Sequence, residues 1–343
     1  MVLRSLGDRN HWFVLVMPAI QQHTPTTIAV RGMKVGLAEH LCTSANVKFI
    51  LADDACAKQG IQFGLFVNGE AYSKSVLKWP KERRICALVE SPINPCYRDP
   101  AELERRFPLI LTHRQELVRR GPPYRELLFG TSWIGLSSVG AVEDIEKEHP
   151  AKSSLVSFIG SIQHASTGAY QFRQDVASAM LRRSDVDCYG KGIREISGKR
   201  EALESYSFSI AMENAAEDLY FSEKLVDCIL LETVPIYYGC PGIGKLLNTA
   251  GLLQFRTLEE LNGILSRVDQ SLWLQMRPAV LENKQRILNN GWYSHRSLLN
   301  RIAAEWLTTV PAELLETPFH RTRWLSVWKN AFAKRFLSGI RKS

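Results

Sequence analysis

Residues 206–241, YSFSIAMENAAEDLYFSEKLVDCILLETVPIYYGCP, carry the clearest indication of the fold. The first seven residues of this stretch alternate in the manner of a β-strand. The apolar side chains of residues 222–232 recur at helical spacing behind Ser222, a typical helix N-cap. A second apolar run at 234–239 predicts another strand. This order of strand, helix and strand is typical of a parallel sheet in an α/β domain.

Polar residues lie at the points of this stretch where ligands bind in such sheets. Glu213 and Asn214 follow the carboxyl end of the first strand. Tyr220, Glu223 and Lys224 fall in or beside the first helical turn, where free N–H groups and the helix dipole favour a diphosphate. We expect Lys224 to contact phosphate oxygens, and Glu213 and Glu223 to accept hydrogen bonds from sugar hydroxyls. The same pattern also fits a buried strand–helix unit whose charges are merely solvated, and the residues alone leave both interpretations open.

The alternation of strands and helices extends outward from this stretch. In the first half we expect the following elements: strands at 12–17, 47–52, 61–67, 85–90 and 107–112, and a helix at 30–44. In the second half we expect a strand at 155–161, a helix at 172–183 and a strand at 186–190. The sequence therefore predicts an α/β fold of two Rossmann-like lobes that face a cleft. We place the lobes at 1–150 and 151–310, followed by a tail at 311–343.

Composition and charge narrow the class of protein. The 343 residues carry a net charge of +8, and residues 317–343 contain seven Lys or Arg and no Asp or Glu. In this tail, aromatic and apolar residues recur every four positions from Trp324 to Ile340, a pattern that fits either an anionic membrane surface or a helix packed across the lobes. The seven cysteines lack metal-ligand spacing, and no apolar run is long enough to span a bilayer. We therefore expect reduced thiols and a cytoplasmic protein, and the tail leaves open a peripheral contact with the inner membrane face.

The stretch at 206–241 resembles the donor-binding signature of glycosyltransferase family 10, the α1,3/1,4-fucosyltransferases, in a short bacterial form. The signature reads F-x-[IL]-x-[FM]-E-N, six residues to a Tyr, x-[ST]-E-K-[LI], and VP-[IV]-x-x-G. The matching positions are Phe208, Ile210, Met212, Glu213, Asn214, Tyr220, Ser222, Glu223, Lys224, Leu225, Val234, Pro235, Ile236 and Gly239. The resemblance implies a GT-B-like fold with the acceptor side in the first lobe and the nucleotide-sugar donor in the second.

The resemblance also implies roles for single residues of the second lobe. Asn214, Tyr220, Glu223 and Lys224 would contact a GDP-sugar. Arg173 stands where the family places an arginine on the first helix of the donor lobe. A guanidinium at that point can pair with the diphosphate and stabilise the departing GDP. Without the resemblance, Arg173 would more simply be a solvated helix charge.

A second match lies in the first lobe. Residues 83–97, RRICALVESPINPCY, resemble the family segment in which an apolar strand ends in Glu-Ser-Pro, and residues 107–117 and 129–134 resemble the segments that follow it. A carboxylate at the end of such a strand is expected to be partly desolvated at the cleft edge and suited to accept a proton. We therefore predict Glu90 as the base that deprotonates the acceptor hydroxyl. The alternative is an ion pair between Glu90 and Arg83 or Arg84.

These observations predict an inverting glycosyltransferase that transfers fucose from GDP-fucose to a hydroxyl of a glycan acceptor, without a metal or other cofactor. One alternative is a non-catalytic protein that binds nucleotide sugars or glycans on the same scaffold. Another is a nucleic-acid-binding protein, although no motif of that class occurs. We expect the loop at 190–200 to be solvated near the donor site and His113 to be structural rather than an acceptor contact.

Overall fold

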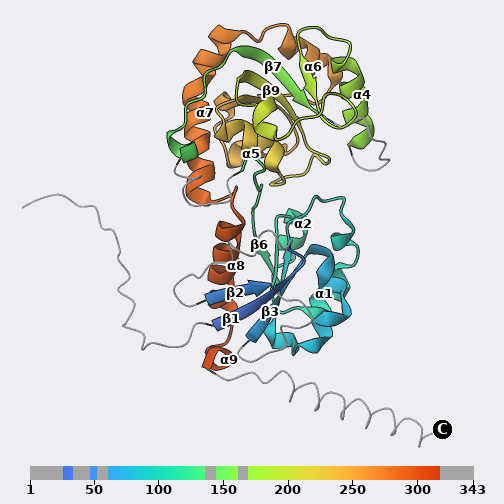
Figure 1. Ribbon diagram of the computed structural model, residues 1–343. Helices are drawn as coiled ribbons and strands as arrows, with labels where there is room; N and C mark the ends of the chain where they lie inside the picture. The colour runs from blue at the N-terminus through green and yellow to red at the C-terminus, as the bar shows by residue number, and fades with distance from the viewer. Residues whose placement is uncertain (1–25, 34–46, 52–60, 136–143, 161–168, 317–343) are drawn as a thin grey trace, which may run out of the picture.

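The computed structural model contains two α/β lobes stacked end to end (Figure 1). It describes residues 26–33, 47–51, 61–135, 144–160 and 169–316. The strand predicted at 12–17 and the tail from residue 317 onward lie outside these ranges, as does most of the helix predicted at 30–44. Within the described residues, no helix is long and apolar enough to cross a membrane.

The N-terminal lobe is built on a six-stranded sheet in which every neighbouring pair is parallel, in the order β2-β1-β3-β4-β5-β6. The strands are β1 (Thr26–Arg31), β2 (Val47–Leu51), β3 (Ile61–Val67), β4 (Arg84–Leu88), β5 (Ile110–Thr112) and β6 (Tyr124–Glu126). Its helices are α1 (Pro100–Arg106) and α2 (Gln115–Val118), with 3-10 turns at Asn68–Tyr72, Lys74–Lys78, Lys81–Arg83 and Pro95–Tyr97. The strands predicted at 47–52, 61–67, 85–90 and 107–112 are confirmed. The helix predicted from residue 30 is wrong at its start, because Val30 and Arg31 belong to β1.

The C-terminal lobe holds a five-stranded parallel sheet in the order β11-β10-β9-β7-β8. The strands are β7 (Ser154–Ile159), β8 (Asp187–Tyr189), β9 (Tyr206–Met212), β10 (Val234–Tyr238) and β11 (Leu253–Gln254). The helices are α4 (Tyr170–Met180), α5 (Glu223–Leu230), α6 (Leu258–Leu265) and α7 (Gln270–Asn290), with 3-10 turns at Lys199–Ala202, Ile243–Lys245 and Thr249–Gly251. The two Rossmann-like lobes predicted from the sequence are therefore present.

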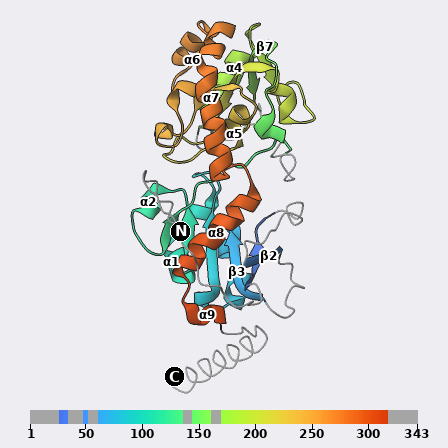
Figure 2. The same cartoon turned by 90° about the vertical axis from the view of Figure 1, so that its left-hand side faces the viewer.

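The last helices return the chain to the first lobe. Helix α7 packs in the C-terminal lobe, Gly291 ends it in the left-handed conformation, and α8 (His295–Thr309) then lies along the N-terminal lobe (Figure 2). Buried residues of α8 join the core of the first sheet, where the Trp306 ring lies 4.5 Å from the Phe63 ring. The short helix α9 (Ala312–Glu316) follows. The predicted extent of the second lobe, to residue 310, is therefore wrong: α8 belongs by packing to the first lobe, because its apolar stripe is covered by β-strands of that lobe.

Candidate active site

The carboxyl ends of the two sheets meet through a direct hydrogen bond. Ser91, three residues beyond β4, donates from its hydroxyl to Asn214 Oδ1 at 2.7 Å, and Asn214 follows β9 by two residues. The Tyr220 hydroxyl donates to the same oxygen at 3.1 Å. This bond brings the segments that carry the predicted base and the predicted donor-binding residues together.

Two further contacts tie the lobes beside this bond. The rings of His113 and Tyr220 lie 5.2 Å apart between centroids. The Arg114 guanidinium pairs with the Glu217 carboxylate at 3.0 Å. Both His113 and Arg114 directly follow β5, so this part of the junction also forms at the carboxyl edge of the first sheet.

Glu90 lies at this junction with an exposed side chain. Its carboxylate Oε1 is 3.5 Å from the Asn68 amide nitrogen, the outer limit of a hydrogen bond. The predicted partial desolvation is therefore wrong, because β4 ends at Leu88 and Glu90 occupies the bend that follows. The guanidinium groups of Arg83 and Arg84, the alternative ion-pair partners, donate to backbone carbonyls instead.

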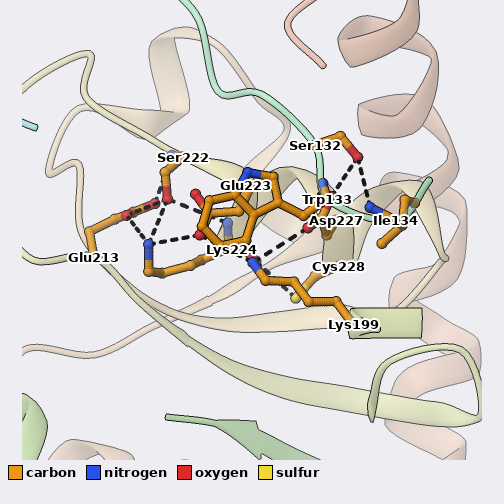
Figure 3. A network of polar contacts seen from close by, with 10 residues as sticks. All are labelled: Ser132, Trp133, Ile134, Lys199, Glu213, Ser222, Glu223, Lys224, Asp227 and Cys228. Carbon is orange, nitrogen blue, oxygen red and sulfur yellow. Dashed lines mark hydrogen bonds and ion pairs between the residues drawn. The ribbon is translucent and has the colours of Figure 1, made fainter. Parts of the chain in front are cut away.

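The first turn of α5 holds a buried network around Lys224 (Figure 3). Ser222 caps the helix as predicted, and Glu213 accepts from both its backbone N–H (2.8 Å) and its hydroxyl (2.6 Å). Lys224 Nζ lies 3.1 Å from Glu223 Oε1 and 3.6 Å from Glu213 Oε2. Two carboxylates thus hold one ammonium group at the helix N-terminus.

The charges of this network shift one another's pKa values. Burial raises the pKa of Glu213, and Lys224 only partly offsets it. Burial lowers the pKa of Lys224, but Glu213 and Glu223 outweigh it, so the net pKa is raised and the ammonium stays charged. The positive charge of Arg173 opposes this increase, so Arg173 acts electrostatically on Lys224. Arg173 is part of α4, where its guanidinium lies 5.5 Å from the centre of the Tyr170 ring.

The burial of Glu213 and Glu223 changes their expected roles. Glu213 is fully buried, and its oxygens are taken up by Ser222 and Lys224. In this conformation Glu213 therefore orients Lys224 and offers no oxygen to a sugar hydroxyl, which corrects the prediction. Glu223 is only 6% exposed and is paired on the same oxygen by Lys199 and Lys224.

The structure adds a group of residues that the sequence reasoning missed. Lys199, in the loop predicted to be solvated, is 3.1 Å from Glu223 and 3.5 Å from Asp227, and its ammonium lies 4.5 Å from the centre of the Trp133 ring. Asp227 is buried on α5 and accepts from the Trp133 backbone N–H and, at 2.6 Å, from the Ser132 hydroxyl. The Trp133 side chain itself is 63% exposed. The four basic residues of the 190–200 loop were the one available signal for Lys199.

Burial raises the pKa of Asp227 to about 6, although Lys199 counteracts it. Through its bonds to Ser132 and Trp133, Asp227 holds the segment that connects the first lobe to the second against α5.

Within the described ranges, no group of three or more His, Cys, Asp or Glu is arranged to hold a metal ion, and the five cysteines there are free thiols.

Solved structures of other proteins have a similar fold. Two solved α1,3-fucosyltransferase structures share the fold: one matches over 80% of this chain and 93% of its own with a TM-score of 0.50, and the other, with GDP, over 88% and 94% with a TM-score of 0.51. Sequence identity in these matches is 15% and 18%, so they bear on the fold alone. The chain has the GT-B fold of glycosyltransferases.

The sequence comparisons find similarity to fucosyltransferases in the C-terminal lobe. Residues 149–271 match glycosyltransferase family 10 (fucosyltransferase), C-terminal domain. A putative fucosyltransferase-like protein of Arabidopsis thaliana is 30% identical over 124 residues, which are 35% of this chain and 24% of that protein. An α-(1,3)-fucosyltransferase of Helicobacter pylori is 36% identical over 53 residues, 16% of this chain and 11% of that protein. The similarity to family 10 therefore lies in the C-terminal lobe, and the chain matches a quarter or less of the length of these relatives.

Proposed function

We propose that the protein is an inverting glycosyltransferase that transfers fucose from GDP-fucose to a hydroxyl group of a glycan acceptor. The observation that carries the proposal is the hydrogen bond between Ser91 and Asn214, since it joins the Glu90 segment to the strand end beside Lys224. In addition to burial, three carboxylates, Glu213, Glu223 and Glu90, raise the pKa of Tyr220, so all three act electrostatically on this residue. Tyr220 therefore lies within electrostatic range both of the proposed base and of the two carboxylates that hold Lys224.

In the proposed reaction, Glu90 takes the proton of the acceptor hydroxyl as its oxygen attacks the anomeric carbon. The bond between that carbon and the diphosphate oxygen breaks on the opposite face, and GDP leaves with the electron pair. Lys224, Arg173 and the N-terminus of α5 stabilise the negative charge that develops on the diphosphate. Tyr220 and Asn214 would line the donor site between the lobes. Glu213 and Glu223 keep Lys224 charged and fixed, which avoids reorganisation during the reaction.

The test separates catalysis from binding. We expect Glu90→Ala to lower kcat by about 100-fold or more while GDP still binds, because a general base contributes about 10²–10⁴-fold. Lys224→Ala should weaken GDP binding and turnover together. Near-normal transfer by Glu90→Ala would remove Glu90 as the base.

The donor is tested by thermal shift with GDP, UDP, ADP and CMP and their sugars. Stabilisation by GDP species alone supports the proposal. Stabilisation by UDP or CMP species would show that the donor is a UDP- or CMP-sugar and not GDP-fucose. Binding of GDP-fucose without transfer to any glycan would instead favour the non-catalytic protein that binds nucleotide sugars on this scaffold.

We further propose that the reaction needs no metal and takes place on the cytoplasmic side, with the basic tail as a contact to an anionic membrane surface. The clustering of basic and aromatic residues after Arg321 supports this contact. Transfer that persists in EDTA would support the first part, and loss of transfer in EDTA would oppose it.

A further inference from the structure

The peptide groups around Glu90 are held from two sides, although its carboxylate is exposed. On the amino side, Asn68 Oδ1 accepts from the backbone N–H of Val89 at 2.9 Å and of Glu90 at 3.3 Å. Because two N–H groups point at this oxygen, the amide orientation of Asn68 is determined. Its nitrogen therefore faces the Glu90 carboxylate, 3.5 Å from Oε1.

Asn68 occupies a backbone position that few residues adopt. It directly follows β3 with φ of +53°, in the left-handed region that asparagine and aspartate tolerate better than other side chains. This conformation ends β3 next to β4, to which β3 is paired through Val67 and Ala87. The short amide side chain of Asn68 therefore lies at the carboxyl end of the neighbouring strand, β4.

On the carbonyl side, two donors converge on the Glu90 oxygen. Tyr97 Oη lies 2.9 Å and His113 Nε2 also 2.9 Å from this atom. A carbonyl oxygen only accepts, so the proton of the His113 ring is on Nε2. Nδ1 is buried and finds no hydrogen-bond partner in the described part of the chain. Burial, with a smaller effect of Arg114, lowers the pKa of His113 to about 4, so the ring is neutral.

We propose that Asn68 is the positioning residue of the Glu90 base. Tyr97 and His113 hold Glu90 from the other side, through its backbone carbonyl oxygen. The inference rests on the proposed function, in which Glu90 accepts the acceptor proton. Asn68 holds the backbone N–H with its oxygen and directs the carboxylate with its NH₂ group. His113 and Tyr97 hold the carbonyl oxygen, and the tilted contact between the His113 and Tyr220 rings joins these residues to the donor lobe.

The substitution Asn68→Asp tests the proposal, because it keeps the oxygen that accepts from the two N–H groups and places a second carboxylate against Glu90. Four other titratable groups near this bend are neutral near pH 7, because burial lowers the pKa of a histidine and raises those of the other three: His113, Tyr97, Cys96 and Tyr220. The Arg114 guanidinium also lies close, 5.1 Å from the centre of the Tyr97 ring, and it pairs with Glu217 in wild type and variant alike. Two carboxylates about 5 Å apart in a water-like medium should move the acid limb of the pH–rate profile upward by about 0.5 pH unit or more. We also expect kcat to fall about tenfold or more with the KM for GDP-fucose within twofold of wild type.

Two further variants keep the test decisive. Asn68→Gly suits the left-handed backbone and removes the amide, so kcat should fall about tenfold with no upward shift of the acid limb. Asn248→Asp is the matched control: Asn248 also accepts from a backbone N–H (3.0 Å) and donates to a carboxylate, Glu282 (2.6 Å), but in the C-terminal lobe. Its pH–rate profile should match that of the wild type.

The inference is overturned if both Asn68 variants retain wild-type kcat and an unshifted acid limb, or if Asn248→Asp shifts the limb equally. Glu90→Gln is measured in parallel. If Glu90→Gln is inactive while the Asn68 variants are normal, the proposed function stands and the positioning role fails. If Glu90→Gln transfers fucose normally, the assignment of the base fails, and the positioning role with it.

Discussion

The strongest quantitative prediction concerns Glu223, whose charge the structure holds in a nearly closed site. Burial by itself would raise the pKa of this carboxyl, but Lys224 and Lys199, each 3.1 Å from Oε1, outweigh it and lower the pKa from 4.5 to about 2. The unfolded chain therefore binds more protons than the native protein between these two values. The resulting stability is present in full above pH 4.5 and is lost as the pH falls toward 2.

The size of this contribution follows from the same shift. A difference of about 2.5 pKa units corresponds to about 3 kcal/mol at pH 7, falling to about 2 kcal/mol at pH 3.5. We expect Glu223→Gln to lower the free energy of unfolding of the C-terminal lobe by that amount. For a lobe of this size, the change at pH 7 corresponds to a Tm about 6–12 °C lower.

The assay is urea unfolding followed by tryptophan fluorescence at pH 7 and at pH 3.5, with each transition fitted separately because two lobes need not unfold together. Glu195→Gln is the control, since Glu195 is an exposed glutamate in the same loop as Lys199. A loss below about 1 kcal/mol at pH 7, or an equal loss at both pH values, would refute the argument that Lys199 and Lys224 keep this carboxylate ionised.

Three other predictions follow from the fold. Gly190→Ala should destabilise the C-terminal lobe by about 2 kcal/mol or more in calorimetry, because φ is +123° and an added Cβ would lie 1.8 Å from the Gly160 carbonyl oxygen; an unchanged Tm would contradict this. Trp306→Ala should cost about 3–5 kcal/mol in unfolding of the N-terminal lobe and spare GDP binding, since its buried ring packs on Phe63; equal destabilisation of the other lobe would show that α8 is misassigned. Deletion of residues 323–343 should reduce co-sedimentation with anionic liposomes, and unchanged sedimentation would exclude the tail as the membrane contact.

Much of the C-terminal lobe could be predicted because its chemistry lies in one continuous stretch. The cap at Ser222, the strand before it and the position of Lys224 at the first turn of α5 all depend on neighbours within a few residues. The role of Glu213 could not be predicted in this way, because its complete burial depends on how β9, the following loop and α5 close around it. A glutamate after a strand looks the same in sequence whether it faces a ligand or anchors a lysine.

Local sequence patterns were enough to predict two α/β lobes, the positions of most strands and the group of charged residues at the start of α5, since alternation, helical spacing and capping are local properties. Long-range packing sets which lobe α8 covers. It also brings Lys199 and Trp133 to α5, and Asn68 and His113 to the peptide of Glu90. These contacts could not be predicted, because the sequence shows only which face of an element is apolar and which side chains are charged. It does not specify the distant residue that will cover that face or pair with that charge.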